Sequence, residues 1–288
     1  MTASIQLNDG TSIPQLGFGT LNVPPDRTPS PENTARTADT VALALTVGYR
    51  LIDTAQMYGN EQGVGQGIAA SGLPREQIYV TSKLGNGNHR PDDVARSFEQ
   101  TLDNLGLDRL DLFLMHWPLP TLYDGDYVST WKAMTDLMAD GRLVTAGVSN
   151  FQPAHLDRIV AETGLVPAVN QVEVHPGFNN TAVREACRRH GTQVEAWSPL
   201  GQGRVLDDET VGKIAARHGQ TPAQVILRWH LQHGNIVIVK SLHRDRMETN
   251  LDVFSFELTD EEMDAIDALD NGEAGRIGPH PDSYDWVP

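Results

Sequence analysis

The feature that most limits how this chain can fold is an alternation of short apolar segments with amphipathic helical patterns. Eight apolar segments recur along the 288 residues, near 16–19, 49–53, 78–82, 110–115, 144–148, 167–172, 192–196 and 236–239. Between them, apolar residues at helical spacing predict helices, for example over 34–47, 97–105, 127–138 and 153–161. Strands that alternate with helices pair in parallel through right-handed crossovers. Eight such units predict an α/β fold of the closed (β/α)8, or TIM-barrel, type.

A β-hairpin is predicted ahead of the first barrel strand. The segment IQLNDGTSIPQLG consists of two short apolar stretches, with Asn8-Asp9-Gly10 as the turn between them. Two observations favour a barrel over an open nucleotide-binding sheet. No GxGxxG follows the first strand, and no linker or change of composition divides the chain. We therefore expect residues 1–288 to form one domain.

The charge and cysteine content exclude several classes of function. With 22 Lys and Arg against 38 Asp and Glu, the formal net charge is −16, which disfavours nucleic acid or an anionic membrane as a partner. The single cysteine, Cys187, cannot form an intrachain disulfide and is expected to be a small packed side chain. No apolar run approaches the ~20 residues of a membrane span, and the first residues lack a signal pattern. We expect a cytoplasmic protein.

Polar or aromatic residues stand at the C-terminal end of nearly every predicted strand, which is where barrels of this type place their active sites. The second strand ends in Asp53, the third in Lys83 and the fourth in His116. Any one of them alone is more simply read as a solvated or packed residue. Together they predict one pocket at the mouth of the barrel, with Tyr58 in the loop after the second strand. The other strand-end residues are Trp117, Ser149, Asn150, Asn170, Gln171, Glu173, Trp197, Ser198, Lys240 and Ser241.

This combination of side chains is suited to protonating a carbonyl oxygen. A phenol has a pKa of about 10 and is a weak acid at neutral pH, but a neighbouring ammonium group favours the phenolate. Lys83 can supply that ammonium group, and Asp53 can keep it charged and in place. His116 can hydrogen-bond the carbonyl oxygen. Tyr58 is then the proton donor, and a reducing cofactor must supply the hydride, since no side chain can.

Seven motifs in this order resemble those of the aldo-keto reductase superfamily, and among its members the bacterial 2,5-diketo-D-gluconate reductase-like proteins are the most similar. The motifs are GYRLIDTAQMYGNE, TSKL, HWP, GVSNF, NQVEVHP, WSPLGQG and VKSLHRDRMETN. The resemblance implies a catalytic tetrad of Asp53, Tyr58, Lys83 and His116. It also implies a substrate pocket formed by Leu21, Tyr58, His116 and Trp117.

The resemblance further implies that NADPH is the cofactor. Ser149, Asn150 and Gln171 would hold the nicotinamide carboxamide, and Trp197 would stack on the nicotinamide ring. Lys240, Ser241 and Arg246 would hold the adenosine 2′-phosphate. The two cations favour NADPH over NADH, because Arg forms a planar fork to phosphate oxygens and Lys adds a point charge. The other cofactor contacts implied in this way are Thr20, Asp53, Ser198, Leu200, Gln202, Leu242 and Asn250.

The sequence departs from the family pattern at several positions. Gly85 stands where many relatives have Trp, and Leu21 where Trp or Phe is frequent, which should widen the substrate pocket. His243 and Thr249 stand where close relatives often have Arg and Glu, which weakens the expected selectivity for NADPH. The short C-terminal tail predicts an open site.

We therefore expect an NADP-dependent oxidoreductase that reduces aldehydes and reactive ketones, including dicarbonyls and keto-sugars. One alternative is a Schiff-base aldolase with Lys83 as nucleophile, although Asp53 would oppose the lowered amine pKa that this chemistry needs. Another is a non-catalytic NADPH-sensing module, which the complete tetrad disfavours. We expect a monomer that acts on a small carbonyl compound. No metal site is predicted, because His230 and His233 have no third ligand nearby in the sequence.

Overall fold

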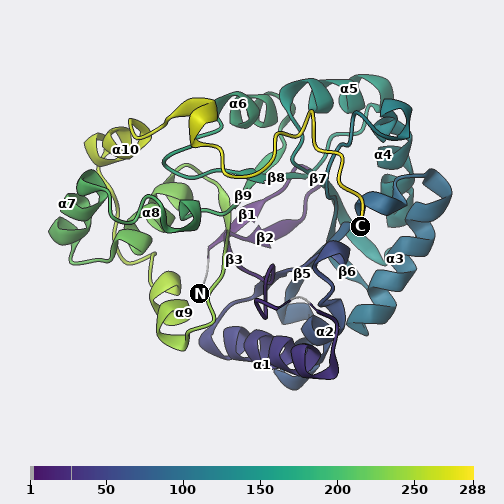
Figure 1. The fold of residues 1–288 in the computed structure, drawn as a ribbon, viewed down its shortest axis with the longest axis horizontal. Helices are drawn as coiled ribbons and strands as arrows, with labels where there is room; N and C mark the ends of the chain where they lie inside the picture. Colours follow the sequence, from purple (N-terminus) through teal and green to yellow (C-terminus); the bar gives the residue numbers. More distant parts are fainter. Residues whose placement is uncertain (1–2, 27) are drawn as a thin grey trace.

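The computed structural model describes residues 3–26 and 28–288, and within them eight parallel strands close into a barrel (Figure 1). The strand order around the barrel is β10-β3-β4-β5-β6-β7-β8-β9, and closure occurs where Val237 pairs with Leu16. The predicted fold and all eight predicted strand positions are confirmed. The strands are β3 (Leu16–Gly19), β4 (Leu51–Asp53), β5 (Tyr79–Leu84), β6 (Leu110–Met115), β7 (Leu143–Ser149), β8 (Val169–Glu173), β9 (Gln193–Trp197) and β10 (Ile236–Val239).

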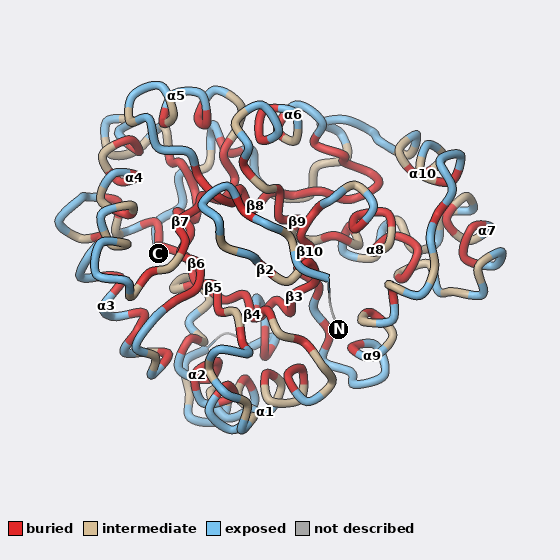
Figure 2. The backbone as a smooth tube through the Cα atoms, turned by 180° about the vertical axis from the view of Figure 1, so that it is seen from behind, coloured by how far each residue is buried: buried red, intermediate tan, exposed pale blue. Residues whose placement is uncertain are grey.

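The predicted hairpin is also present, as β1 (Ser4–Gln6) paired antiparallel with β2 (Ser12–Pro14). In the view from behind, it lies across the barrel (Figure 2). Asn8 donates a hydrogen bond to the carbonyl oxygen of Pro167 (3.1 Å), and Thr11 lies 3.1 Å from the Thr145 hydroxyl. Both contacts are on the side where the barrel strands begin. The hairpin therefore closes the end of the barrel opposite the predicted site.

The helices surround the barrel, and two of them begin earlier than apolar periodicity alone predicts. The helix predicted over 34–47 begins at Pro31, where Ser30 caps it by accepting a hydrogen bond from the Asn33 N–H (3.1 Å), and the one over 97–105 begins at Pro91. Proline suits the first helical position, and a first turn that is mostly polar shows no apolar stripe. The helices are α1 (Pro31–Val47), α2 (Glu61–Ala70), α3 (Pro91–Leu105), α4 (Tyr127–Asp136), α5 (Pro153–Thr163), α6 (Thr181–His190), α7 (Glu209–His218), α8 (Pro222–Gln232), α9 (Arg244–Leu251) and α10 (Asp260–Asp267). Short 3-10 turns lie at Gln56–Tyr58, Arg75–Gln77, Asn86–Asn88, Tyr123–Gly125, Leu137–Asp140, Gly201–Gly203 and Gly272–Gly275.

The apolar core has two parts. The larger part lies between the barrel and the helices, where Trp131 and Trp229 are almost fully buried. Figure 2 shows the barrel strands as mostly buried and the outer sides of the helices as exposed. The smaller part includes Leu51 and Leu112 together with Ile13 from the hairpin. Because side chains alternate along a strand, Asp53 faces the same side as Leu51, two residues before it. The apolar side chains inside the barrel are therefore followed directly by polar groups at the C-terminal ends of the strands.

None of the helices in the described residues is long and apolar enough to cross a membrane.

Each of the two histidines considered as metal ligands has a protein partner. His230 Nε2 donates to the carbonyl oxygen of Pro199 (3.0 Å), and His233 Nε2 lies 2.9 Å from Asp267. Cys187 is buried, and burial raises the pKa of its thiol to about 11, so it stays a neutral packed group.

Candidate active site

A cleft of ≈ 920 Å³ opens at the C-terminal ends of the barrel strands. Sites for small molecules and cofactors usually measure roughly 300–1,000 Å³ and are lined mainly by apolar and aromatic groups with a few polar ones. Most of the residues that the sequence singled out line this cleft. They are Leu21, Asp53, Tyr58, His116, Trp117, Ser149, Asn150, Gln171, Trp197, Ser198, Leu200, Gln202, Lys240 and Arg246.

The remaining residues that the sequence singled out lie behind or beside the cleft. Thr20 is buried, and its backbone N–H and hydroxyl both donate to the carbonyl oxygen of Asp53, at 3.0 Å each. Lys83 is fully buried and lies behind the cleft, in contact with the lining residues Asp53 and Tyr58. Ser241, Leu242 and Asn250 belong to the segment that includes α9, next to the lining residues Lys240 and Arg246.

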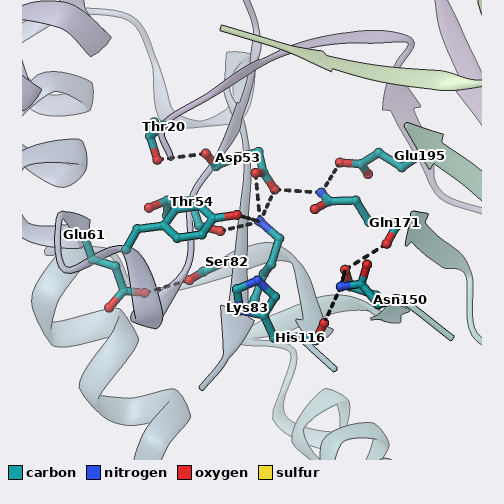
Figure 3. A network of polar contacts seen from close by, with 12 residues as sticks. Thr20, Asp53, Thr54, Glu61, Ser82, Lys83, His116, Asn150, Gln171 and Glu195 are labelled. Atoms are coloured by element: carbon teal, nitrogen blue, oxygen red, sulfur yellow. Dashed lines mark hydrogen bonds and ion pairs between the residues drawn. The ribbon is translucent and has the colours of Figure 1, made fainter. Parts of the chain in front are cut away.

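The centre of the site is the buried ion pair of Lys83 and Asp53 (Figure 3), with a phenol at its edge. Lys83 Nζ donates to both carboxylate oxygens of Asp53, at 2.8 and 2.6 Å, and to the carbonyl oxygen of Thr54 at 2.8 Å. It also lies 3.2 Å from the hydroxyl oxygen of Tyr58. Burial by itself lowers the pKa of Lys83, but the Asp53 charge and the Tyr58 phenol outweigh it and raise the pKa above its ordinary value. The amine therefore stays protonated and is a poor nucleophile.

The loop that carries Tyr58 is fixed by its own hydrogen bonds. Tyr58 ends a 3-10 turn, and Gly59 follows with φ 69°, a left-handed conformation that favours glycine. The Asn60 side chain donates to the carbonyl oxygen of Thr20 (2.8 Å) and accepts from the Thr54 hydroxyl (2.9 Å). The phenol is thus held against the ends of β3 and β4 and does not depend on a mobile loop for its position.

His116, directly after β6, is a neutral imidazole beside the phenol. The rings of His116 and Tyr58 meet edge to face with centroids 5.7 Å apart. Burial, together with the charge of Lys83, lowers the pKa of His116 well below its usual range. Its Nδ1 atom is buried and has no hydrogen-bond partner among the described residues. A buried N–H without an acceptor is costly, so the single proton belongs on Nε2.

Asn150 connects several lining residues. It follows β7 with φ 63°, a left-handed conformation that asparagine tolerates better than most residues. Its side-chain amide donates to the carbonyl oxygen of His116 (2.9 Å) and to the Ser149 hydroxyl (3.0 Å). Its oxygen accepts from the indole N–H of Trp197 (2.9 Å). These bonds hold the Trp197 ring in one position at the side of the cleft.

A buried acid that the sequence did not single out lies behind these residues. Glu195, on β9, is fully buried, and Gln171 Nε2 donates to Glu195 Oε1 (2.7 Å) and to Asp53 Oδ2 (2.9 Å). Burial, together with the Asp53 charge, raises the pKa of Glu195 to about 8. The available sequence signal is the alternation along β9, in which Glu195 faces the same side as Trp197, two residues later.

Replacing Glu195 with glutamine is expected to remove a pH dependence of stability. Because the pKa of Glu195 is raised in the folded protein, the fold binds this proton more tightly than the unfolded chain does. The stability that results is complete below the ordinary pKa of 4.5 and is lost as the pH rises towards about 8. Across this range, the free energy of unfolding of the wild type minus that of Glu195→Gln should fall by about 1.4 kcal/mol per pH unit.

Urea titrations of both proteins at several pH values measure this difference. A difference that stays constant over the range would mean that Glu195 is already ionised in the fold near neutral pH.

The last part of the chain returns across the mouth of the barrel. In Figure 1 the yellow tail runs from α10 past α6 and α5 to the C-terminus. Glu173, at the end of β8, accepts hydrogen bonds from the backbone N–H groups of Ile277 (2.6 Å) and Gly278 (2.9 Å). Further along, Tyr284 packs on Trp117 with ring centroids 4.1 Å apart. The tail covers part of the cleft, so the site is less open than the short tail suggested.

The tail also supplies lining residues that sequence reasoning missed. Asn86, next to Gly85, donates a hydrogen bond to the carbonyl oxygen of Trp286 (2.8 Å) and so fixes the end of the tail beside this part of the barrel. The aromatic residues of the segment SYDW were the only signal, and nothing local indicates where they pack. The lining residues from the tail are Gly278, Pro279, Tyr284 and Trp286.

Comparison with known proteins gives a consistent family match. The model of the Aldo/keto reductase family matches residues 15–271. An aldo-keto reductase of Mycobacterium sp. (strain KMS) is 47% identical over 283 residues, which cover 98% of each chain. Glyoxal reductase of Bacillus subtilis (strain 168) is 43% identical over 279 residues, covering 97% of this chain and 96% of that protein.

Solved structures with this fold include two that contain the cofactor. A mutant of Gox0644 in complex with NADPH has a TM-score of 0.90 and 44% identity, covering 99% of this chain and 100% of that chain. A Bombyx mori aldo-keto reductase in complex with NADP has a TM-score of 0.86 and 36% identity, covering 94% and 93% of the two chains.

Proposed function

This chain belongs to the aldo/keto reductase family, and we propose that it reduces aldehydes and reactive ketones, including dicarbonyls and keto-sugars, with NADPH as cofactor and Tyr58 as general acid. It is an NADP-dependent oxidoreductase that acts on small carbonyl compounds. The observation that carries the finer proposal is the contact of buried Lys83 with both the Asp53 carboxylate and the Tyr58 hydroxyl, directly behind the cleft.

Tyr58 is the proton donor in this proposal. A cation 3.2 Å from the phenol oxygen stabilises the phenolate that remains after the proton has left. Asp53 keeps that cation charged, and the proton moves from the Tyr58 hydroxyl to the substrate oxygen as negative charge develops there. Neutral His116, protonated on Nε2, donates a second hydrogen bond to the same oxygen and favours the same transition state.

The residues along the cleft fit NADPH, which when bound supplies the hydride. The Gln171 amide has both N–H bonds directed to the carboxyl groups of Asp53 and Glu195, so its oxygen remains as the acceptor for a carboxamide N–H. The Trp197 indole, fixed by Asn150, offers a flat face for the nicotinamide ring. Lys240 and Arg246 are the Lys and Arg residues that line the cleft, and neither forms an ion pair within the described part of the chain. They remain available to a phosphate.

Replacing Arg246 with alanine is expected to raise the KM for NADPH by roughly ten- to one-hundredfold, as the loss of one hydrogen bond to a charged group predicts. The KM for NADH should stay unchanged, because NADH lacks the 2′-phosphate. Steady-state kinetics with both cofactors measure the change. Arg244→Ala is the matched control, because Arg244 lies on the same helix but pairs with Glu248 (2.7 Å). Equal effects on NADPH and NADH would contradict the assignment of Arg246 to the 2′-phosphate.

The substrate end of the cleft is mainly aromatic and apolar. Leu21, Trp117, Tyr284 and Trp286 line it. The backbone of Trp286 is held by Asn86, the residue after Gly85, and Gly85 is the position at which many relatives have Trp. We therefore propose uncharged carbonyl compounds as substrates. The name of the Bacillus subtilis relative, glyoxal reductase, supports dicarbonyls as the first candidates.

A steady-state screen of aldehydes, dicarbonyls and keto-sugars, with NADPH and NADH side by side, tests the proposed function. We expect methylglyoxal to be reduced, with NADPH preferred. NADPH binding without turnover of any carbonyl compound would instead support a sensing role. Borohydride trapping of a substrate on Lys83 would support the aldolase, which the raised pKa of Lys83 opposes.

We further propose that residues 1–288 form one domain that acts as a cytoplasmic monomer. The hydrogen bonds from the tail back to Glu173 and Asn86 support a single unit, because they join the end of the chain to the barrel. The single buried cysteine suits a reducing compartment. Light scattering during gel filtration tests the oligomeric state, and a mass near twice 31.6 kDa would contradict a monomer.

A further inference from the structure

Glu195 is a buried acid for which the proposed mechanism has no use. It lies on β9 directly opposite Gln171 of β8 and is fully buried. Within the described residues, one of its oxygens accepts a hydrogen bond only from Gln171 Nε2 (2.7 Å), and the other has no partner. A buried carboxyl group that makes so few hydrogen bonds is costly to keep. Its one side-chain hydrogen bond within the described residues is with a residue of the site.

The Gln171 amide nitrogen has two N–H bonds, and both are directed to acids. One meets Asp53 Oδ2 (2.9 Å) and the other meets Glu195 Oε1 (2.7 Å), as Figure 3 shows. Both oxygens of Asp53 accept hydrogen bonds from Lys83 in an ion pair, so the nitrogen of the amide must face this carboxylate and the oxygen must point elsewhere. Asp53 alone leaves the amide plane free to rotate about that hydrogen bond. A second acceptor fixes the plane.

We propose that Glu195 is a positioning residue that takes up the second N–H of Gln171, so that this amide presents only its carbonyl oxygen to the cleft and selects the N–H group of the cofactor's carboxamide. This inference rests on the proposed function, because it concerns how NADPH is held. Without Glu195, the second N–H loses its acceptor, the amide turns, and Gln171 can offer the cleft a donor as well as an acceptor. Selectivity for a carboxamide should then decline.

The test compares the binding of NADP⁺ with that of its 3-acetylpyridine analogue, which keeps the carbonyl group but lacks the N–H donor. Glu195→Met removes the acceptor at similar length, and Glu195→Gln restores a carbonyl acceptor. Glu61→Gln is the matched control, because Glu61 is another buried acid but accepts from Ser82 (2.6 Å) and Asn104 (3.0 Å) and does not contact Gln171. Dissociation constants are measured by quenching of tryptophan fluorescence.

The wild type, Glu195→Gln and Glu61→Gln should share one preference for NADP⁺ over the analogue, within about twofold. Glu195→Met should reduce that preference by roughly three- to tenfold, as the loss of one neutral hydrogen bond predicts. A purely structural role for Glu195 would weaken both ligands equally and leave the preference unchanged, which would overturn the inference. If the wild type bound neither ligand, both the proposed function and this inference would be wrong.

A second measurement covers the case in which Glu195→Met does not fold. In a crystal structure of the wild type with NADP⁺, Gln171 should still contact both Asp53 and Glu195 through its nitrogen, with its oxygen on the carboxamide nitrogen. A complex in which Gln171 has left Glu195 would overturn the inference.

Discussion

Tyr58→Phe is expected to lower kcat for carbonyl reduction by roughly 10²–10⁴-fold, the range for the loss of a positioned general acid. The substitution removes only the hydroxyl that lies 3.2 Å from Lys83 Nζ. The ring that packs against His116 remains, so the shape of the cleft is preserved. The dissociation constant for NADPH should therefore stay unchanged.

Single-turnover kinetics and fluorescence titration with NADPH separate these two quantities. Tyr49→Phe is the control, because it removes the hydroxyl of a different tyrosine, which is buried and donates to the carbonyl oxygen of Met247 (3.2 Å) away from the cleft. Turnover near the wild-type value in Tyr58→Phe would rule out Tyr58 as the acid. A loss that followed weaker NADPH binding would give Tyr58 a role in binding only.

Lys83→Met is expected to abolish measurable turnover and also to destabilise the protein by about 3–5 kcal/mol, the usual cost of removing one partner of a buried ion pair. The ammonium group is fully buried, and its loss leaves the Asp53 carboxylate without its cation. The remaining Gln171 hydrogen bond to Asp53 cannot neutralise that charge. Activity falls for a separate reason, because the phenol loses the cation that stabilises its conjugate base.

The double variant Asp53→Asn/Lys83→Met separates the two effects. It removes both charges, so urea titrations should show that much of the lost stability returns, while turnover remains absent. If Lys83→Met were as stable as the wild type, the pair would not be a buried ion pair in solution. If the double variant reduced carbonyl compounds at the wild-type rate, the cation would not be needed by Tyr58.

The barrel and the centre of the site could be predicted because both depend on local patterns. Alternating strands and helices define the closed barrel, and its geometry brings the ends of β4, β5 and β6 together. Asp53, Lys83 and His116 follow from that rule, and Tyr58 from its place just after β4. That Lys83 lies behind the cleft and not on its surface could not be read from the strand end. It results from the position of Asp53 and of the Thr54 carbonyl, which take up the amine.

Two parts of the site could not be predicted because they depend on contacts distant in the sequence. The role of Glu195 can be recognised only from its hydrogen bond with Gln171 on the neighbouring strand, since Gln171 also contacts Asp53. The tail is held in position by Glu173, which is 104 residues before Ile277 in the chain. Nothing in the composition of either segment specifies its partner.

The most direct test of the central claim uses NADPH in which the C4 hydrogen that is transferred has been replaced by deuterium. The measurement determines which product carries the deuterium. In the presence of methylglyoxal or another reactive carbonyl compound, the wild-type protein should form an alcohol with one deuterium on the former carbonyl carbon for each NADPH oxidised. An alcohol without that label, or oxidation of NADPH without any alcohol, would contradict hydride transfer to a carbonyl group at this site.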